Sequence, residues 1–223
     1  RRVRVVVQAL YRALDQVLPM SRDVADCAHL LNIIAGHDEH DSTSSAAEVP
    51  DFTKSLVADV KGLKVGIPKE FFVKGMDADV EKAVRAAVKQ LEALGAEIVD
   101  ISLPHTEYAI SSYYLIAPAE AATNLERYDG VSYGERVDGS GIVEMMTNTR
   151  SEKFGEEVKR RIMIGNYARS AGYYDAYYLK ALKVRRLVKE DYDKAFEQVD
   201  VIVAPTAPTP NARVLFARGV HPV

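Results

Sequence analysis

Residues 172–210 of the sequence read GYYDAYYLKALKVRRLVKEDYDKAFEQVDVIVAPTAPTP, and this stretch decides the fold. At about 100° per residue, its first two thirds carry a single apolar stripe, which predicts a long amphipathic helix. The continuous apolar run within residues 199–205 predicts a strand covered on both faces and ended by a rigid Pro/Thr loop. The stripe consists of Tyr174, Tyr177, Tyr178, Ala181, Val184, Val188, Tyr192 and Ala195.

A cation, Arg185, lies inside this stripe, about 40° from its centre. A charge on an apolar face is costly unless an opposite charge meets it. Two interpretations are open. In the first, Arg185 lays its stem on the core and reaches solvent, or it pairs with a structural acid such as Glu120. In the second, its planar guanidinium binds a carboxylate of a ligand through two parallel hydrogen bonds.

The composition is that of a globular chain. Of the 223 residues, 48% are hydrophobic and 27% are charged, so one large domain, or part of a larger one, can bury a sizeable core. No apolar run has the length of a membrane span, and a net charge of −3 with scattered lysines gives no strong nucleic-acid footprint. The single cysteine, Cys27, fits a reducing compartment and indicates a buried inert thiol rather than a nucleophile.

A βαβ unit precedes the deciding stretch. Residues 63–70 and 96–104 each read as a strand, and the apolar face of Asp79–Leu94 predicts a helix between them. Strand, helix and strand in this order predict two parallel strands with a right-handed crossover. The strand within residues 199–205 should join the same sheet, which gives an α/β fold.

Further helices are expected around this unit. One begins at a Ser21 cap and ends at Gly36. Another, Glu107–Tyr128, contains Pro118, which should kink or break it near Ala117. A loop and two more helices follow, at residues 128–141, 142–150 and 155–170.

Complete catalytic motifs are missing. The sequence has no G-x-S-x-G elbow, phosphate-binding glycine loop, CxxC or H-E-x-x-H. One cluster, His37, Asp38, His40 and Asp41, has the residue types of a metal site, but it lacks the fixed spacing of a helix face. Its side chains are better suited to hydrogen-bond the backbone of a turn. By residues alone, the chain is an α/β domain with an arginine suited to a carboxylate and no nucleophile.

Long ordered blocks of this sequence resemble a known family. The chain is similar to the A subunits of glutamyl/aspartyl-tRNA amidotransferases, a branch of the amidase-signature family. The resemblance extends roughly from Leu14 to Pro210, whereas residues 1–20 and 211–223 match the family pattern poorly. The blocks that carry it are residues 19–44, 62–72, 91–125, 127–134, 150–185 and 193–210.

The resemblance implies an α/β/α sandwich around a mixed sheet, with residues 1–223 forming a partial amidase domain. It also implies a glutaminase subunit of a heterotrimer that passes ammonia to a partner subunit. That partner uses ATP and Mg²⁺ to convert Glu-tRNA(Gln) or Asp-tRNA(Asn) into Gln-tRNA(Gln) or Asn-tRNA(Asn), and it makes most of the contacts with the tRNA. The glutaminase component itself takes no cofactor or metal, and the complex is cytoplasmic, or organellar in a eukaryote.

Site residues carried over from the family are few. The family nucleophile is a serine activated by a second serine and a lysine, and this block is absent from residues 1–223, so the chain alone is expected to be inactive. Arg185 matches the arginine that holds the α-carboxylate of glutamine, and Tyr133 matches the tyrosine beside the substrate. For Tyr133 the alternative is an aromatic side chain that plugs the space under its loop.

Two other functions stay open. The chain could be a non-catalytic amino-acid-binding or interaction module on the same fold, or it could be a stand-alone amide hydrolase. The blocks RYDGVSYG, residues 127–134, and GYYDAYY, residues 172–178, are specific to the amidotransferase branch and argue against the stand-alone hydrolase.

Overall fold

The computed structural model describes residues 19–40, 44–57 and 59–210, and it divides the chain into two compact units. Unit 1 comprises Arg1–Leu56 and Ile110–Arg185, and unit 2 comprises Val57–Ala109 and Arg186–Val223. The two poorly matched ends fall almost entirely outside the described residues. That the chain forms one partial amidase domain stays a prediction.

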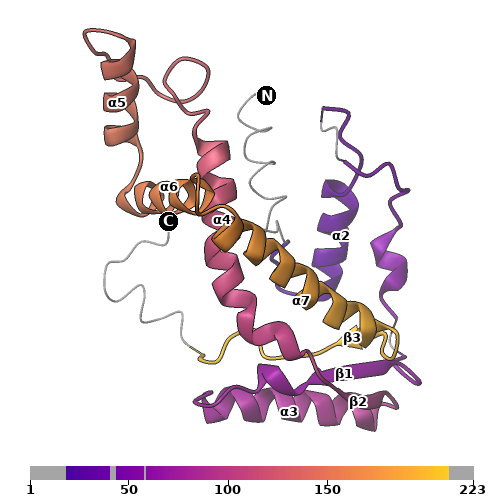
Figure 1. Ribbon diagram of the computed structural model, residues 1–223. Helices are drawn as coiled ribbons and strands as arrows, with labels where there is room; N and C mark the ends of the chain where they lie inside the picture. Colours follow the sequence, from indigo (N-terminus) through magenta and orange to yellow (C-terminus); the bar gives the residue numbers. More distant parts are fainter. Residues whose placement is uncertain (1–18, 41–43, 58, 211–223) are drawn as a thin grey trace. The chain divides into compact units, whose positions relative to one another are not determined.

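Unit 2 is built on a three-stranded parallel sheet in the order β2-β1-β3 (Figure 1). The strands are β1, Lys64–Pro68, β2, Glu97–Ile101, and β3, Val201–Ile202. The central strand β1 pairs with β2 along its whole length and with β3 at two positions. The predicted parallel βαβ unit is therefore confirmed, and the third strand joins the sheet as expected. It is shorter than residues 199–205, and its Val201 is 37% exposed, so the prediction that this strand is covered on both faces is wrong at Val201.

Helices cover both faces of this sheet. Helix α3, Ala78–Ala93, begins where the side chain of Asp77 accepts a hydrogen bond from the backbone N–H of Asp79. Its Val88 and Leu91 pack on one face, together with Val65 and Ile67 of β1. The second half of α7, Lys180–Phe196, contributes Tyr192 and Ala195 to a cluster with Val99, Ile101 and Leu103. Unit 2 thus has the layers of an α/β fold, which confirms the predicted class.

Gly66 in the middle of β1 makes this packing possible. A Cβ atom placed on it would lie 2.9 Å from Ile101 Cδ1 and 3.0 Å from Val199 Cγ2. Its neighbours Val65 and Ile67 point to the opposite face, where α3 lies, since side chains alternate along a strand. One face of the central strand therefore carries valine and isoleucine. The other face has no side chain at Gly66, where Ile101 and Val199 approach most closely.

Unit 1 is helical. Its elements are α2, Val24–Ile34, η1, Phe52–Ser55, α4, Ala109–Leu125, α5, Ile142–Lys153, α6, Glu156–Arg169, the π-helical turn η4, Asp175–Leu179, and the start of α7. The predictions of α5 and α6 are confirmed. The Ser21 cap is wrong, because Asp23 accepts from the N–H of Asp26 at 2.8 Å and caps α2 instead. Two 3₁₀ turns, η2, Lys69–Phe71, and η3, Pro104–Tyr108, belong to unit 2.

Pro118 lies inside α4 without interrupting it. The helix runs from Ala109 to Leu125, so the predicted break near Ala117 is wrong. Helix α6 crosses α4 at this point: a Cβ atom on Gly165 would lie 2.0 Å from the carbonyl oxygen of Pro118. The two backbones meet where α6 has no side chain, and both Gly165 and Pro118 are buried.

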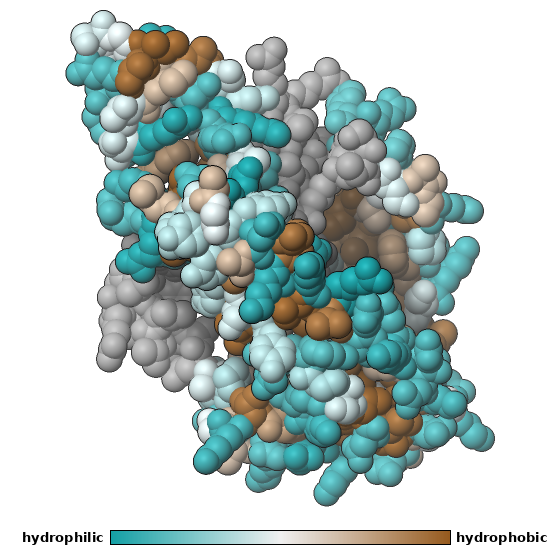
Figure 2. All heavy atoms as spheres, in the orientation of Figure 1, coloured by the Kyte–Doolittle hydropathy of each residue, from teal (hydrophilic) through white to brown (hydrophobic). Residues whose placement is uncertain are grey.

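Unit 1 also exposes large apolar side chains. On α5, Ile142 and Val143 are 63% and 76% exposed, and Figure 2 shows apolar atoms at the surface over this helix. On α2, Val24 and Ile33 are 72% and 78% exposed. The predicted apolar face of α2 therefore buries only Ala28 fully within the described residues.

Candidate functional site

The loop that follows α4 positions Tyr133. The side chain of Asp129 accepts hydrogen bonds of 2.8 Å from the backbone N–H groups of Val131 and Ser132, and the N–H of Gly130 donates to the carbonyl of Tyr133. The bonds from Ser132 and Val131 lower the pKa of Asp129. The Tyr133 ring is half-buried, with its centroid 6.3 Å from that of Tyr128. This packing agrees with the aromatic plug, and contact of Tyr133 with a substrate stays a prediction.

Arg185 is exposed, and no described residue forms a hydrogen bond or an ion pair with it. This exposure agrees with the interpretation in which Arg185 reaches solvent, and not with a guanidinium enclosed by the apolar stripe. The fully buried residues of α7 are Ala181, Asp191 and Ala195, and Arg185 lies about 80° from their mean direction. Its role in holding a carboxylate stays a prediction, for which an unpaired guanidinium leaves all its donors free.

A π-helical turn explains why the helical wheel misplaced the tyrosines before α7. The N–H of Leu179 donates to the carbonyl of Tyr174 at 2.9 Å, a bond between residues five apart. A turn of this kind shifts every residue before it relative to the face that follows. Tyr173 and Tyr177 consequently lie in an exposed cluster with Tyr167, with ring centroids 4.5 to 6.2 Å apart.

Glu120 binds a tyrosine and not Arg185. The hydroxyl of Tyr178 donates to Glu120 Oε1 at 2.5 Å. Burial, followed by this bond to a carboxylate, raises the pKa of Tyr178 to about 12, so its hydroxyl keeps the proton that it donates. The predicted alternative of an Arg185–Glu120 pair is therefore wrong, because the carboxylate is already bound by its neighbour on η4.

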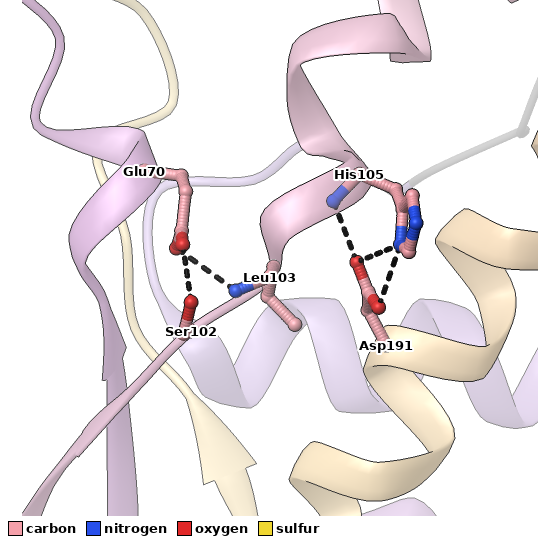
Figure 3. A network of polar contacts seen from close by, with 5 residues as sticks. All are labelled: Glu70, Ser102, Leu103, His105 and Asp191. Carbon is pink, nitrogen blue, oxygen red and sulfur yellow. Dashed lines mark hydrogen bonds and ion pairs between the residues drawn. The ribbon is translucent and has the colours of Figure 1, made fainter.

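Unit 2 contains a polar network that was not predicted from the sequence (Figure 3). The buried carboxylate of Asp191 accepts from the backbone N–H of His105 at 2.8 Å and lies 3.0 Å from its Nδ1. Glu70 accepts from the hydroxyl of Ser102 at 2.5 Å and from the N–H of Leu103 at 2.9 Å. The two acids therefore hold the corner where β2 ends and η3 begins. No sequence motif indicates this role of Glu70 and Asp191, although Asp191 lies beside the apolar stripe.

These residues resemble a catalytic triad only in composition. The hydroxyl of Ser102 donates to Glu70 and so is not activated by His105. For both acids, burial raises the pKa, but the hydrogen bonds outweigh it: the pKa of Glu70 is lowered by Leu103 and Ser102, and that of Asp191 by His105. The network fixes backbone groups and supplies no nucleophile.

The metal interpretation of residues 37–41 gains no support. Asp38 accepts from the N–H of His40 at 2.9 Å, and its own N–H donates to Ser44, so a turn forms as expected. Asp41 lies outside the described residues. Within residues 19–40, 44–57 and 59–210, no three histidine, cysteine or acidic side chains are grouped as metal ligands. Cys27 is half-buried, with its Sγ 3.0 Å from the Ser21 hydroxyl.

Comparison with known proteins establishes the family. The sequence profile of the amidase family matches residues 2–217. The chain belongs to the amidase family. It is 58% identical over 209 residues to the glutamyl-tRNA(Gln) amidotransferase A subunit of Geobacter metallireducens and 60% identical over 203 residues to that of Carboxydothermus hydrogenoformans. These alignments cover 93% and 91% of the chain, which spans 43% and 42% of the two relatives.

Solved structures agree with this placement in the amidase family. The glutamyl-tRNA(Gln) amidotransferase A subunit of Thermotoga maritima superposes with a TM-score of 0.62 at 37% identity, over 86% of this chain and 37% of that one. A bacterial aryl acylamidase of the amidase-signature family superposes with a TM-score of 0.64 over 86% of this chain and 36% of that one. At 20% identity it shows the fold alone. The resemblance and the fold class predicted from the sequence are confirmed. None of the described helices is long and apolar enough to span a membrane.

Proposed function

We propose that the chain is part of the glutamine-hydrolysing A subunit of a tRNA-dependent amidotransferase. The observation that carries this proposal is the identity of 54–60% to curated A subunits along at least 90% of the chain. Amidases with other named substrates support only the shared fold, since they are far less identical. The stand-alone amide hydrolase and the non-catalytic module therefore have no observation in their favour.

In the proposed site, this chain binds the substrate, and the rest of the glutaminase supplies the catalytic residues. Arg185 holds the α-carboxylate of glutamine, for which its unpaired, exposed guanidinium provides two parallel donors. Tyr133 lies beside the substrate on the loop that Asp129 orders. The serine nucleophile, its partner serine and the lysine come from residues outside 1–223, and no group of this chain attacks the amide.

The remaining proposals concern the complex. The ammonia released from glutamine passes to a partner subunit in a heterotrimer. That partner uses ATP and Mg²⁺ to amidate Glu-tRNA(Gln) and Asp-tRNA(Asn), and it contacts the tRNA. The assembly works in the cytoplasm, or in an organelle of a eukaryote.

A chimaera tests the role of Arg185. The aligned 209-residue segment replaces its counterpart in the Geobacter metallireducens protein. We expect the chimaera to hydrolyse glutamine, and Arg185→Ala to raise KM for glutamine about 10- to 150-fold, because a charged hydrogen-bonded contact is lost. Steady-state release of ammonia measures both.

The neighbouring arginine is the matched control. Arg186 is also exposed on α7 but pairs with Glu190 at 2.9 Å, so Arg186→Ala should leave KM unchanged. Equal KM values for both variants, or a folded chimaera without glutaminase activity, would contradict the proposal. Residues 1–223 alone should release no ammonia, and activity that stays with the homogeneous chain would contradict the placing of the nucleophile.

A further inference from the structure

The loop that carries Tyr133 is attached to α5 on both sides of that residue. The hydroxyl of Thr149 accepts a hydrogen bond from the backbone N–H of Val137 at 3.0 Å and lies 3.4 Å from the carbonyl oxygen of the same residue. On the other side, Gly130 lies so close to the helix that a Cβ atom on it would be 2.9 Å from Thr149 Oγ1 and 3.3 Å from Met145 Sδ. Both ends of the segment that contains Tyr133 therefore contact one face of α5.

Gly130 links this attachment to Tyr133 directly. Its N–H donates to the carbonyl of Tyr133 at 3.2 Å, and its φ of 77° lies in the left-handed region that favours glycine. Thr149, which it contacts, is buried, with 3% of its surface exposed. A buried side chain in the middle of a helix has little freedom to move, so it gives the loop a fixed support.

Other contacts between the loop and α5 are more open to water. Lys153 pairs with Glu135 at 2.7 Å, but both residues are exposed, and an exposed ion pair contributes little. By contrast, removal of the Thr149 hydroxyl would leave the N–H of Val137 without this acceptor at a half-buried position, which is costly. The hydroxyl of Thr149 is therefore the contact on which the order of the loop depends most.

We infer that Thr149 is a positioning residue of the proposed glutamine site. From the buried face of α5, its hydroxyl keeps Tyr133 in the place that binds glutamine, without itself contacting the substrate. The inference rests on the proposed function, because it requires Tyr133 to lie beside the substrate. The alternative is that Thr149 only stabilises unit 1, in which case its loss would lower the melting temperature and leave KM for glutamine unchanged.

Kinetics of the chimaera described above test the inference. Thr149→Val keeps the shape of the side chain and removes the hydroxyl, so the loop should spend less time in its ordered arrangement. We expect KM for glutamine to rise about 3- to 10-fold with kcat within about twofold, because one hydrogen bond is lost and Tyr133 is assigned to binding rather than to the attack on the amide. KM does not depend on the fraction of the enzyme that is folded, so partial unfolding cannot imitate this result.

A double-mutant cycle assigns the effect to Tyr133. In a chimaera with Tyr133→Ala, which alone should raise KM, Thr149→Val should have no further effect, because the side chain that it positions is gone. Thr149→Ser retains the hydroxyl and should keep KM within about twofold of the unmodified chimaera. Thr147→Val is the matched control: Thr147 is exposed and its hydroxyl donates to the carbonyl of Val143 within α5, so KM should not change.

Gly130→Ala makes the same test from the loop if Thr149→Val does not fold. The new Cβ would press on Thr149 at a strained φ, so KM should again rise, and the rise should vanish in the Tyr133→Ala background. An unchanged KM in the variant tested, or equal rises with and without the Tyr133 side chain, would overturn the inference. An unchanged KM in Tyr133→Ala would instead contradict the proposed site itself.

Discussion

Two carboxylates of unit 2 act on the backbone rather than on a ligand. Glu70 and Asp191 each accept a main-chain N–H, from Leu103 and His105, on either side of the corner at the end of β2. Leu103, between these bonds, is fully buried. The end of a strand and the start of a 3₁₀ turn leave backbone N–H groups without partners. The two acids therefore accept hydrogen bonds from these N–H groups next to the core of the unit.

Asp191→Asn tests this role at the scale of one residue. The amide keeps the shape but loses the charge, so the free energy of unfolding should fall by about 1–3 kcal/mol at pH 7. The pKa of Asp191 is lowered in the folded state, so this stability is present above the ordinary carboxyl pKa and is lost as pH falls through the lowered one. Urea unfolding at pH 7 and at about pH 3 should show a smaller difference between variant and wild type at the lower pH.

A control for Asp191 stands two residues further along the same helix. Asp193 is exposed and pairs with Lys189, so Asp193→Asn should change the free energy of unfolding by less than about 1 kcal/mol. Equal losses for the two variants would show that the bonds to His105 contribute nothing beyond surface charge.

At the scale of elements, the crossing of α4 and α6 depends on a missing side chain. Gly165→Ala should improve the helix propensity of α6 by about 1 kcal/mol. The new Cβ would meet the backbone of Pro118, which has no rotamer to yield, so the helices must separate. We expect a net loss of about 1–3 kcal/mol in the free energy of unfolding, measured by urea titration with far-UV circular dichroism.

Asn166→Ala provides the comparison on the next position of α6. This residue is exposed, so the substitution changes propensity without a clash and should leave stability equal or slightly higher. A Gly165→Ala variant as stable as Asn166→Ala would mean that the two helices do not need this close approach.

The elements also show where sequence reasoning succeeds. Helices α3, α5 and α6 and strands β1 and β2 were predictable because local periodicity and end signals agree with the tertiary structure. Of the two outcomes predicted for Pro118, the break does not occur, since the lost hydrogen bond of one proline is outweighed by the packing of a buried helix. The cap of α2 was misjudged because Ser21 and Asp23 are equally good candidates by type, and geometry alone selects Asp23.

The candidate site was harder to predict than the fold. A wheel drawn at constant pitch cannot detect the π-helical turn before α7, so it joined the tyrosines of residues 174–178 to the stripe of the helix that follows. The pairing of Glu120 with Tyr178 joins residues 58 positions apart, which no local pattern encodes. Arg185 and Tyr133 were singled out by family resemblance, and that assignment stays a prediction.

At the scale of the whole molecule, exposed apolar surface dominates the expected behaviour. Several large apolar side chains of unit 1 are more than 70% exposed, among them Met20, Ile33 and Val143. Patches of this kind usually mark surfaces that associate with other molecules. We expect the 223-residue chain to self-associate with rising concentration, and Val143→Lys to reduce the association, both measured by sedimentation velocity.

A second lysine variant separates charge from apolar surface. Thr147→Lys adds the same charge at another exposed position of α5 without removing an apolar group, so it should leave the association nearly unchanged. A wild-type chain that sediments as a monomer at every concentration would contradict the expectation, and equal effects of both lysines would assign the change to charge alone.

The strand order of unit 2 has a consequence for synthesis. The central strand β1 ends at Pro68, but its neighbour β3 begins only at Val201, about 130 residues later. A ribosome that adds about 5–20 residues per second needs some 7–27 s to cover that distance. For that period one flank of the nascent β1 has no native neighbour, so its main-chain groups on that side stay unpaired until Val201 and Ile202 are made.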